Sequence, residues 1–157
     1  MWAGARLTVP WKPATVFAMA QAPELVREFT VVAAVIRDQE DRVLLTQRLE
    51  GRHMGGLWEF PGGKIDSAES PEKALMREIR EELGAEVEVE GIFEAVYYRY
   101  DWGPVLVLAY TCRLLTGTLH NIGVAEHRWA HPRDLADFPF LPADQPIISR
   151  LIGSATS

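Results

Sequence analysis

Three glutamates lie close together in residues 72–83, at Glu78, Glu81 and Glu82. At 100° per residue, the spacings i, i+3 and i+4 place all three on one arc of a helix. Like charges at this spacing repel by roughly 0.2–0.5 kcal/mol per pair, and the last turn of a helix favours cations. The arrangement costs stability unless a cation binds there, and carboxylate oxygens are the ligands that Mg²⁺ and Mn²⁺ prefer. The alternative is a solvated face on which Arg77 and Glu81 form an ordinary i, i+4 ion pair.

A turn of sequence Pro61-Gly62-Gly63 precedes these glutamates. Neither glycine has a Cβ, so the backbone of the turn can approach other groups closely. A carbonyl oxygen of the turn can therefore join the carboxylates around one cation. The sequence predicts a cation site made only of oxygen ligands.

The glycine turn and the glutamates belong to a longer pattern that resembles a known family. From Gly63 the chain reads GKIDSAESPEKALMREIREELGA, which is similar to the Nudix box G-x5-E-x7-R-E-U-x-E-E-x-G-U. Only the last apolar position is weak, because the small Ala85 fills it. The resemblance to the MutT-like branch of the Nudix hydrolases extends over about residues 31–150 and includes residues 56–64 and 141–146. The residues that match the box are Gly63, Glu69, Arg77, Glu78, Ile79, Glu81, Glu82 and Gly84.

The resemblance implies a metal site and a reaction. Nudix hydrolases add water to a phosphoanhydride of a nucleoside diphosphate that is linked to another group. By this resemblance Glu81 and Glu82 bind Mg²⁺, for which Mn²⁺ can substitute, and the Gly62 carbonyl completes the protein ligands. Glu78 is both a ligand and the expected general base, and Arg77 orients it. A metal-bound water has a lowered pKa, so a carboxylate can take its proton.

Further residues take roles from the same resemblance. Glu69 supports the loop before the helix and counts with the catalytic residues. Arg48 occupies the position of a phosphate-contacting arginine, and a planar guanidinium suits phosphate; the alternative is a solvated arginine at a sheet edge. His53 corresponds to a substrate-pocket histidine in some relatives, or is an exposed loop histidine without a role. Lys64, at the end of the similar segment 56–64, is also predicted to bind substrate.

Asp144 is the candidate for reading the base. It lies where the 8-oxo-dGTP enzyme of this branch has an asparagine, and the CTP pyrophosphohydrolase subgroup has the same Pro-Ala-Asp run. An ionised carboxylate only accepts hydrogen bonds, so Asp144 favours an exocyclic amine such as cytosine N4 or adenine N6. The alternative is an N-cap of the final helix, and both roles can coexist.

The chain departs from the family pattern at one metal ligand. The mutator-type enzyme has a further metal-binding glutamate six residues before a strand tryptophan, and the slot before Trp129 is Gly123. Glu126 is the nearest carboxylate. We expect it either to replace that ligand or simply to cap the strand, which leaves the number of metal ions open.

The elements that must position these residues begin with two β-branched runs. Residues 30–37 and 42–48 are predicted strands, joined as a hairpin by the polar turn at 38–41. Residues 49–63 contain too many glycines and prolines for a regular element, so they are predicted to form a long loop.

The helix over residues 72–83 has signals at both ends. Ser70 is the expected N-cap, Pro71 the first helical residue, and Gly84 the residue that ends the helix. The pattern indicates an α/β fold, and the resemblance implies a Nudix-type α/β/α sandwich around a mixed sheet. The other predicted elements are strands over 86–90, 92–100, 105–115 and 126–130, a short helix over 133–136 and a helix over 144–152.

Composition indicates one globular domain and limits its partners. The chain has 157 residues, 48% of them hydrophobic, and a net charge of −6. Its acidity disfavours long nucleic acid as a partner, and no apolar run approaches the length of a membrane helix. Cys112 is the sole cysteine, which excludes an intramolecular disulfide and suits a reducing cytoplasm. We expect a flexible N-terminal extension over residues 1–28 and a Nudix hydrolase domain over 29–157, acting as a monomer or homodimer on a small nucleotide.

The predicted function is Mg²⁺-dependent hydrolysis of nucleoside triphosphates, including oxidised or modified ones, to nucleoside monophosphate and pyrophosphate. Alternatives within the same chemistry are ADP-ribose and dinucleoside polyphosphates. An alternative from another class is a non-catalytic Nudix-like domain that senses a nucleotide or binds a protein. Such domains typically lose glutamates of the box, and this chain has all of them.

Overall fold

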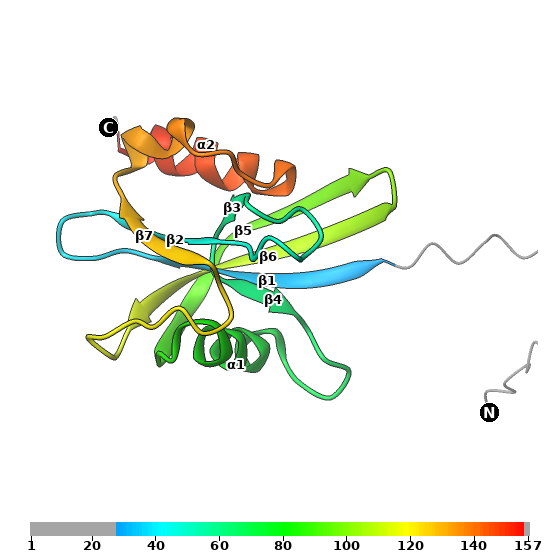
Figure 1. Cartoon of the computed structure of the whole chain (residues 1–157), viewed down its shortest axis with the longest axis horizontal. Helices are drawn as coiled ribbons and strands as arrows, with labels where there is room; N and C mark the ends of the chain where they lie inside the picture. The colour runs from blue at the N-terminus through cyan, green and yellow to red at the C-terminus, as the bar shows by residue number, and fades with distance from the viewer. Residues whose placement is uncertain (1–27, 156–157) are drawn as a thin grey trace, which may run out of the picture.

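A computed structural model describes residues 28–155 as two β-sheets between two helices (Figure 1). The strands of the larger sheet lie in the order β4-β1-β6-β5, and those of the smaller sheet in the order β3-β2-β7. β1 and β6 are parallel and the other pairs are antiparallel, so the larger sheet is mixed. The larger sheet consists of β1 (Phe29–Ile36), β4 (Gly62–Lys64), β5 (Val87–Tyr100) and β6 (Gly103–Leu114), and the smaller of β2 (Val43–Gln47), β3 (Trp58–Glu59) and β7 (Glu126–Ala130).

Helices α1 (Pro71–Leu83) and α2 (Gln145–Ser154) lie on opposite sides of the sheets, as Figure 1 shows. Two short 3₁₀ helices, Pro132–Asp137 and Pro142–Asp144, precede α2. The core has two halves, because alternate residues of a strand face opposite sides. On β1, Val32 and Ile36 pack in the half that contains α1, while Val35 packs in the half that contains α2. The α/β class and the mixed sheet that were predicted are confirmed.

The predicted ends of α1 are also confirmed. The Ser70 side chain accepts a hydrogen bond from the Lys73 N–H, and Pro71 is the first helical residue. Gly84 adopts a left-handed conformation with φ 62°, and its N–H donates to the Arg80 carbonyl. These caps fix the register of the helix and therefore the direction of its glutamates.

The predicted hairpin is wrong. β1 pairs with β4 and β6 along its two edges, and β2 pairs with β3 and β7 in the other sheet. Only an isolated bridge between Arg37 and Val43 links the ends of the two strands. Since both edges of β1 are occupied, β2 cannot pair alongside it.

The prediction of a loop over residues 49–63 is wrong in part. Residues 58–59 form β3 against β2, and Gly62 and Gly63 begin β4 against β1. Strands this short are defined by the long strands that they pair with, which local propensity does not reveal. Similarly, the strands predicted over 86–90 and 92–100 are one strand, β5, with irregularities in its register on either side of Ile92.

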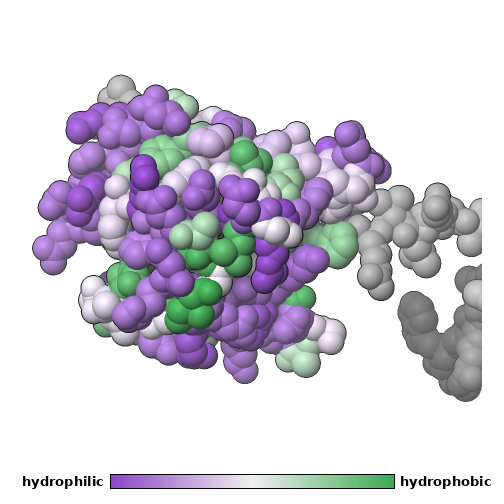
Figure 2. Space-filling view, in the orientation of Figure 1, coloured by the Kyte–Doolittle hydropathy of each residue, from purple (hydrophilic) through white to green (hydrophobic). Residues whose placement is uncertain are grey.

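The predicted extension of residues 1–28 lies outside the described residues, except for Glu28. Among residues 28–155, no helix has the length and apolar character that crossing a membrane requires. The face shown in Figure 2 is mainly hydrophilic, with small hydrophobic patches. The large hydrophobic side chains exposed within the described range are Ile92, Tyr97, Trp102, Leu115 and Ile122.

Candidate active site

Two adjoining cavities share five lining residues, and one of them lies beside the N-terminal half of β1. The aromatic cavity, of about 440 Å³, is lined by Phe29, Phe60, Tyr100 and Trp102 among others. The carboxylate cavity, of about 350 Å³, is lined by four glutamates. The four glutamates are Glu59, Glu78, Glu81 and Glu82. The residues common to both cavities are Arg48, Arg52, Glu59, Glu78 and Glu82.

The glycine turn and α1 meet at the carboxylate cavity. A Cβ placed on Gly63 would lie 2.3 Å from Cδ of Glu78, so the carboxylate of Glu78 rests directly on the glycine backbone. The Gly62 N–H donates a hydrogen bond of 3.2 Å to Oε2 of Glu82. The structure thus brings together the turn and two of the three helix glutamates, as the sequence predicts. Only glycine at residue 63 permits this approach.

Negative charge accumulates in this cavity. Burial and the nearby charges of Glu59 and Glu78 raise the pKa of Glu82 to about 8, against the opposing hydrogen bond from Gly62. Burial also raises the pKa of Glu59, and the positive charge of Arg48 opposes that shift. A bound divalent cation would relieve this repulsion, because it attracts every carboxylate that faces it.

The oxygen donors around the carboxylate cavity fit Mg²⁺ or Mn²⁺ by type. As the side chains stand, no three His, Cys, Asp or Glu residues within 28–155 are already arranged to hold a metal ion. Glu81 is 60% exposed and lies 3.3 Å from Arg77, although it lines the cavity. Its side chain must rotate to join Glu78 and Glu82 at a common ion.

Arg77 links the loop before α1 to the glutamates of the helix. Its Nη1 donates to Oε1 of Glu78 at 2.9 Å, and its Nη2 donates to Oε1 of Glu69 at 2.6 Å. Nη2 also donates to the Lys64 carbonyl at 3.0 Å. Hydrogen bonds from Arg77 lower the pKa of Glu69, and the carboxylates in turn raise the pKa of Arg77. Arg77 therefore lies where it orients Glu78, and Glu69 anchors Arg77.

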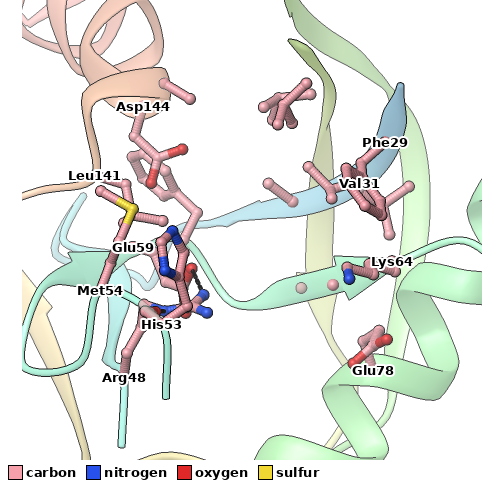
Figure 3. Close-up of a pocket in the computed structure, with 18 of the residues that line it drawn as sticks. Phe29, Val31, Arg48, His53, Met54, Glu59, Lys64, Glu78, Leu141 and Asp144 are labelled. Atoms are coloured by element: carbon pink, nitrogen blue, oxygen red, sulfur yellow. Dashed lines mark hydrogen bonds and ion pairs between the residues drawn. The ribbon is translucent and has the colours of Figure 1, made fainter. Parts of the chain in front are cut away.

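Arg48 lies where the two cavities meet, and its partner is Glu59. Nη1 of Arg48 donates to both carboxylate oxygens of Glu59, at 2.8 and 3.0 Å, and Nε donates to the His53 carbonyl at 2.9 Å (Figure 3). The His53 ring packs edge-on against Trp102, with centroids 5.6 Å apart. The predicted substrate residues Arg48 and His53 both line the aromatic cavity.

Glu59 was not predicted as a site residue, although it lies within the segment that resembles the family. Two-residue alternation could have indicated it, because Trp58 is buried in the core while Glu59 faces the cavities. A carboxylate beside Pro61-Gly62-Gly63 also requires a cation partner when buried. Because glycines and prolines surround Glu59 in the sequence, residues 49–63 were predicted as a loop and the short strand was not recognised.

Asp144 lies on the opposite side of the aromatic cavity from Glu78 (Figure 3). It is 5% exposed, its Oδ2 has no hydrogen-bond partner among the described residues, and its carboxyl accepts a hydrogen bond from the Phe60 N–H. Complete burial, together with the charge of Glu59, raises its pKa well above the usual range. Asp144 occupies the N-cap position of α2, as the alternative interpretation predicts, but its side chain makes no capping hydrogen bond there.

Lys64 lines the aromatic cavity. Its Nζ lies 4.5 Å from the centroid of the Phe29 ring, a cation–π contact. Trp102 stacks on Tyr100 at 4.8 Å and contacts Phe29 edge-on at 5.9 Å. This part of the cavity wall thus combines the positive charge of Lys64 with a group of aromatic rings.

Glu126 is not among the described residues that line either cavity, and it forms an ion pair of 2.6 Å with Arg128. Gly123, in the slot of the expected glutamate, lies against the end of α1. Its N–H donates to the Glu82 carbonyl at 3.1 Å, and a Cβ there would lie 3.3 Å from Cα of Glu82. The structure therefore places a close backbone contact where the family pattern has a carboxylate.

Comparison with known proteins agrees with this geometry. A family model described as the NUDIX domain matches residues 27–151. The chain belongs to the NUDIX family.

Individual relatives identify the branch of the NUDIX family. CTP pyrophosphohydrolase of Escherichia coli K12 is 39% identical over 122 residues, which cover 75% of this chain and 87% of that protein. The 8-oxo-dGTP diphosphatase of Haemophilus influenzae is 35% identical over 124 residues, covering 78% and 90%. The solution structure of the E. coli ORF135 protein matches with a TM-score of 0.69 and 30% identity, covering 84% of this chain and 93% of that one.

These relatives confirm the prediction of a Nudix hydrolase of the MutT-like branch. Nudix hydrolases generally use divalent metal cations. The individual roles of the site residues, and the ion itself, remain predictions. Every predicted site residue except Glu126 lines one of the two cavities or, like Arg77 and Glu69, is linked to Glu78 by hydrogen bonds.

Proposed function

We propose that the protein hydrolyses nucleoside triphosphates to nucleoside monophosphate and pyrophosphate with Mg²⁺ as its cofactor. The observation that carries this proposal is the adjacency of the two cavities. One has aromatic rings and an unpartnered buried carboxyl, and the other has four glutamates, with Arg48 at their junction. The aromatic cavity is suited to bind a nucleobase, and the carboxylate cavity is suited to bind a polyphosphate together with its metal ion. The printed functions of the relatives support the same substrate class.

Glu78, Glu81, Glu82 and the Gly62 carbonyl are the groups that would hold Mg²⁺. When bound, Mg²⁺ neutralises phosphate charge and lowers the pKa of water in its coordination sphere. Glu126 is an additional candidate only if its side chain leaves Arg128. The fit rests on oxygen donors in a partly buried cluster, where burial and then the charges of Glu59 and Glu78 raise the pKa of Glu82.

Glu78 is the general base in this proposal. Its carboxylate rests on Gly63 and accepts a hydrogen bond from Arg77 at 2.9 Å, so one oxygen is held while the other can accept a proton from water. Arg77 is in turn fixed by Glu69 and the Lys64 carbonyl. Phosphoryl transfer requires mainly this kind of positioning and charge compensation.

Arg48 and Lys64 provide positive charge for the phosphates. Arg48 lines both cavities, and Lys64 lines the aromatic cavity. His53 shapes the wall through Trp102 and holds Arg48 through its carbonyl oxygen. A triphosphate that extends from the aromatic cavity to the carboxylate cavity passes these groups.

Asp144 reads the base. Its unpartnered Oδ2 is suited to accept a hydrogen bond from an exocyclic amine, such as cytosine N4 or adenine N6. Because its pKa is raised, the protonated form gains population, and that form also donates a hydrogen bond to an adjacent ring nitrogen. This combination favours cytosine and adenine nucleotides, including modified forms that retain the amine.

We place this reaction in the cytoplasm, with the protein as a monomer or homodimer and without long nucleic acid as a partner. Cys112 is buried and burial raises the pKa of its thiol to about 12, so it is a poor nucleophile. The net charge of −6 opposes binding to polyphosphate chains that carry no divalent cation.

The test is a panel of canonical, oxidised and methylated triphosphates with Mg²⁺, alongside ADP-ribose and a dinucleoside polyphosphate. We expect Mg²⁺-dependent release of pyrophosphate and monophosphate, abolished in Glu81→Gln but unchanged in Glu72→Gln at the other end of α1. Full activity of Glu81→Gln, or no metal-dependent turnover, would contradict the proposal. Calorimetric binding of nucleotide without hydrolysis would favour a non-catalytic domain instead.

A further inference from the structure

Arg48 and Glu59 are held near each other, offset by two residues along the strands, by the pairing of β2 with β3. Arg48 directly follows β2, and its N–H donates to the Leu57 carbonyl at 3.0 Å. Glu59 ends β3, where it pairs with Thr46 of β2. Both backbones are therefore fixed before either side chain makes a contact, and the ladder sets the distance between the two charges.

The contacts of the guanidinium leave one nitrogen available. Glu59 takes both of its hydrogen bonds from Nη1 alone, and the His53 carbonyl takes the bond from Nε. Within residues 28–155 no hydrogen bond donated by Nη2 of Arg48 is found. Two of the three guanidinium nitrogens of Arg48 are thus used to orient the group, and Nη2 is available to an oxygen of a ligand.

The position of Arg48 indicates which ligand oxygen this is. Arg48 lines both the aromatic and the carboxylate cavity, as does Glu59. A ligand that occupies both cavities must pass the guanidinium, and in a nucleoside triphosphate the base is joined to the metal-bound phosphates through the ribose and the α-phosphate, whose oxygens are the charged acceptors nearest the base. A guanidinium donates well to phosphate oxygens when its orientation is fixed.

Burial makes the pair a rigid one. The side chain of Glu59 is 16% exposed and that of Arg48 is 29% exposed. Breaking such a pair leaves the remaining charge poorly solvated, while a free arginine side chain samples many rotamers. The Glu59 carboxylate therefore restricts the orientation of the Arg48 side chain more than a fully exposed partner would.

We infer that Glu59 is a positioning residue, which holds the Arg48 guanidinium so that Nη2 binds a phosphate of the substrate. This inference rests on the proposed function and extends it to a residue outside the Nudix box. Two other roles for Glu59 predict different results. If Glu59 instead blocks access of phosphate to Arg48, replacing it should tighten phosphate binding. If Glu59 is a ligand of the cation, replacing it should weaken metal binding.

The experiment compares Glu59→Leu and Glu59→Gln with wild type. Binding of inorganic tripolyphosphate with Mg²⁺ is measured by calorimetry, and Mn²⁺ affinity without nucleotide by electron paramagnetic resonance. We expect Glu59→Leu to weaken tripolyphosphate binding about tenfold, the effect of losing one hydrogen bond to a charged group. Glu59→Gln retains an oxygen acceptor for Nη1 and should restore most of the affinity. Mn²⁺ affinity should change little in either variant.

Two further comparisons separate positioning from general damage. In an Arg48→Ala background, Glu59→Leu should have no additional effect on tripolyphosphate binding. Glu86→Gln is the matched control, because Glu86 pairs with Arg80 at 2.7 Å on the exposed side of α1. It should bind tripolyphosphate like wild type, and cytidine, which has no phosphate, should bind equally to wild type and both Glu59 variants.

Three results would overturn the inference. Tighter tripolyphosphate binding by Glu59→Leu would show that Glu59 masks Arg48. Equal loss of Mn²⁺ affinity in the Leu and Gln variants would show a metal ligand. Additive effects with Arg48→Ala would show that Glu59 acts independently of Arg48. If wild type hydrolyses no triphosphate, the proposed function fails, but these binding measurements still decide the role of Glu59.

Discussion

The carboxylate of Glu78 lies against the backbone of Gly63, so closely that a Cβ at residue 63 would be 2.3 Å from Cδ of Glu78. The two residues come from different elements, β4 and α1, which the larger sheet and the core hold in place. Any side chain at residue 63 must displace the proposed general base or move the strand.

Gly63→Ala should therefore lower kcat by about 100-fold, since a displacement near 1 Å at a reacting group has an effect of this size. The measurement is steady-state kinetics with saturating Mg²⁺, together with thermal unfolding to show that the fold is intact. Gly117→Ala is the control, because nothing lies within 4 Å of a Cβ at that residue. Wild-type kcat in Gly63→Ala would show that Glu78 is not the base in this position.

Arg77→Lys should lower kcat roughly 10–100-fold with little change in KM, as is usual when a group that orients a ligand is lost. Arg77 donates hydrogen bonds to Glu69, Glu78 and the Lys64 carbonyl at the same time. A lysine ammonium cannot reproduce this planar set of bonds. Arg80→Lys on the same helix is the control for an arginine-to-lysine exchange, because Arg80 pairs with the exposed Glu86. Equal kcat values for the two variants would refute the orienting role of Arg77.

Asp144→Asn should change how stability depends on pH. In the unfolded chain Asp144 ionises near 3.8, and burial raises its pKa in the folded protein. The folded state thus binds this proton more tightly, so the contribution of Asp144 to the free energy of unfolding falls as pH rises above 3.8. The asparagine variant lacks this loss and keeps an oxygen that can accept from Phe60.

We therefore expect Asp144→Asn to be more stable than wild type around neutral pH, with a difference that disappears as the pH approaches 3.8. Thermal unfolding across this range measures the difference directly. A difference that does not vary with pH would show that Asp144 is not a buried acid with a raised pKa.

The sequence predicts well those features that depend on local spacing. The caps at Ser70 and Gly84 define α1, and its 3.6-residue period places Glu78 and Glu82 on the side that faces the cavity. The resemblance of residues 63–85 to the Nudix box also identified the family correctly. These signals lie within one helix and the turn before it, so no tertiary contact is needed to recognise them.

The features that the sequence did not reveal depend on contacts between distant segments. Glu59 lies in a two-residue strand that exists because it pairs with β2, and its partner Arg48 is eleven residues away. The unpaired Oδ2 of Asp144 results from the packing of the 3₁₀ helix before α2 against the sheets. Pairing and burial of this kind are tertiary properties, which single-residue patterns do not encode.

The most direct test is whether the carboxylate cavity binds a divalent cation beside a polyphosphate. Mn²⁺ binding is measured by electron paramagnetic resonance, with and without a non-hydrolysable triphosphate, in wild type and in the Glu78→Gln/Glu82→Gln variant. We expect the variant to lose at least about tenfold in Mn²⁺ affinity and the triphosphate to tighten Mn²⁺ binding only in wild type. Equal Mn²⁺ affinity in the two proteins, unaffected by triphosphate, would contradict a catalytic metal site on α1.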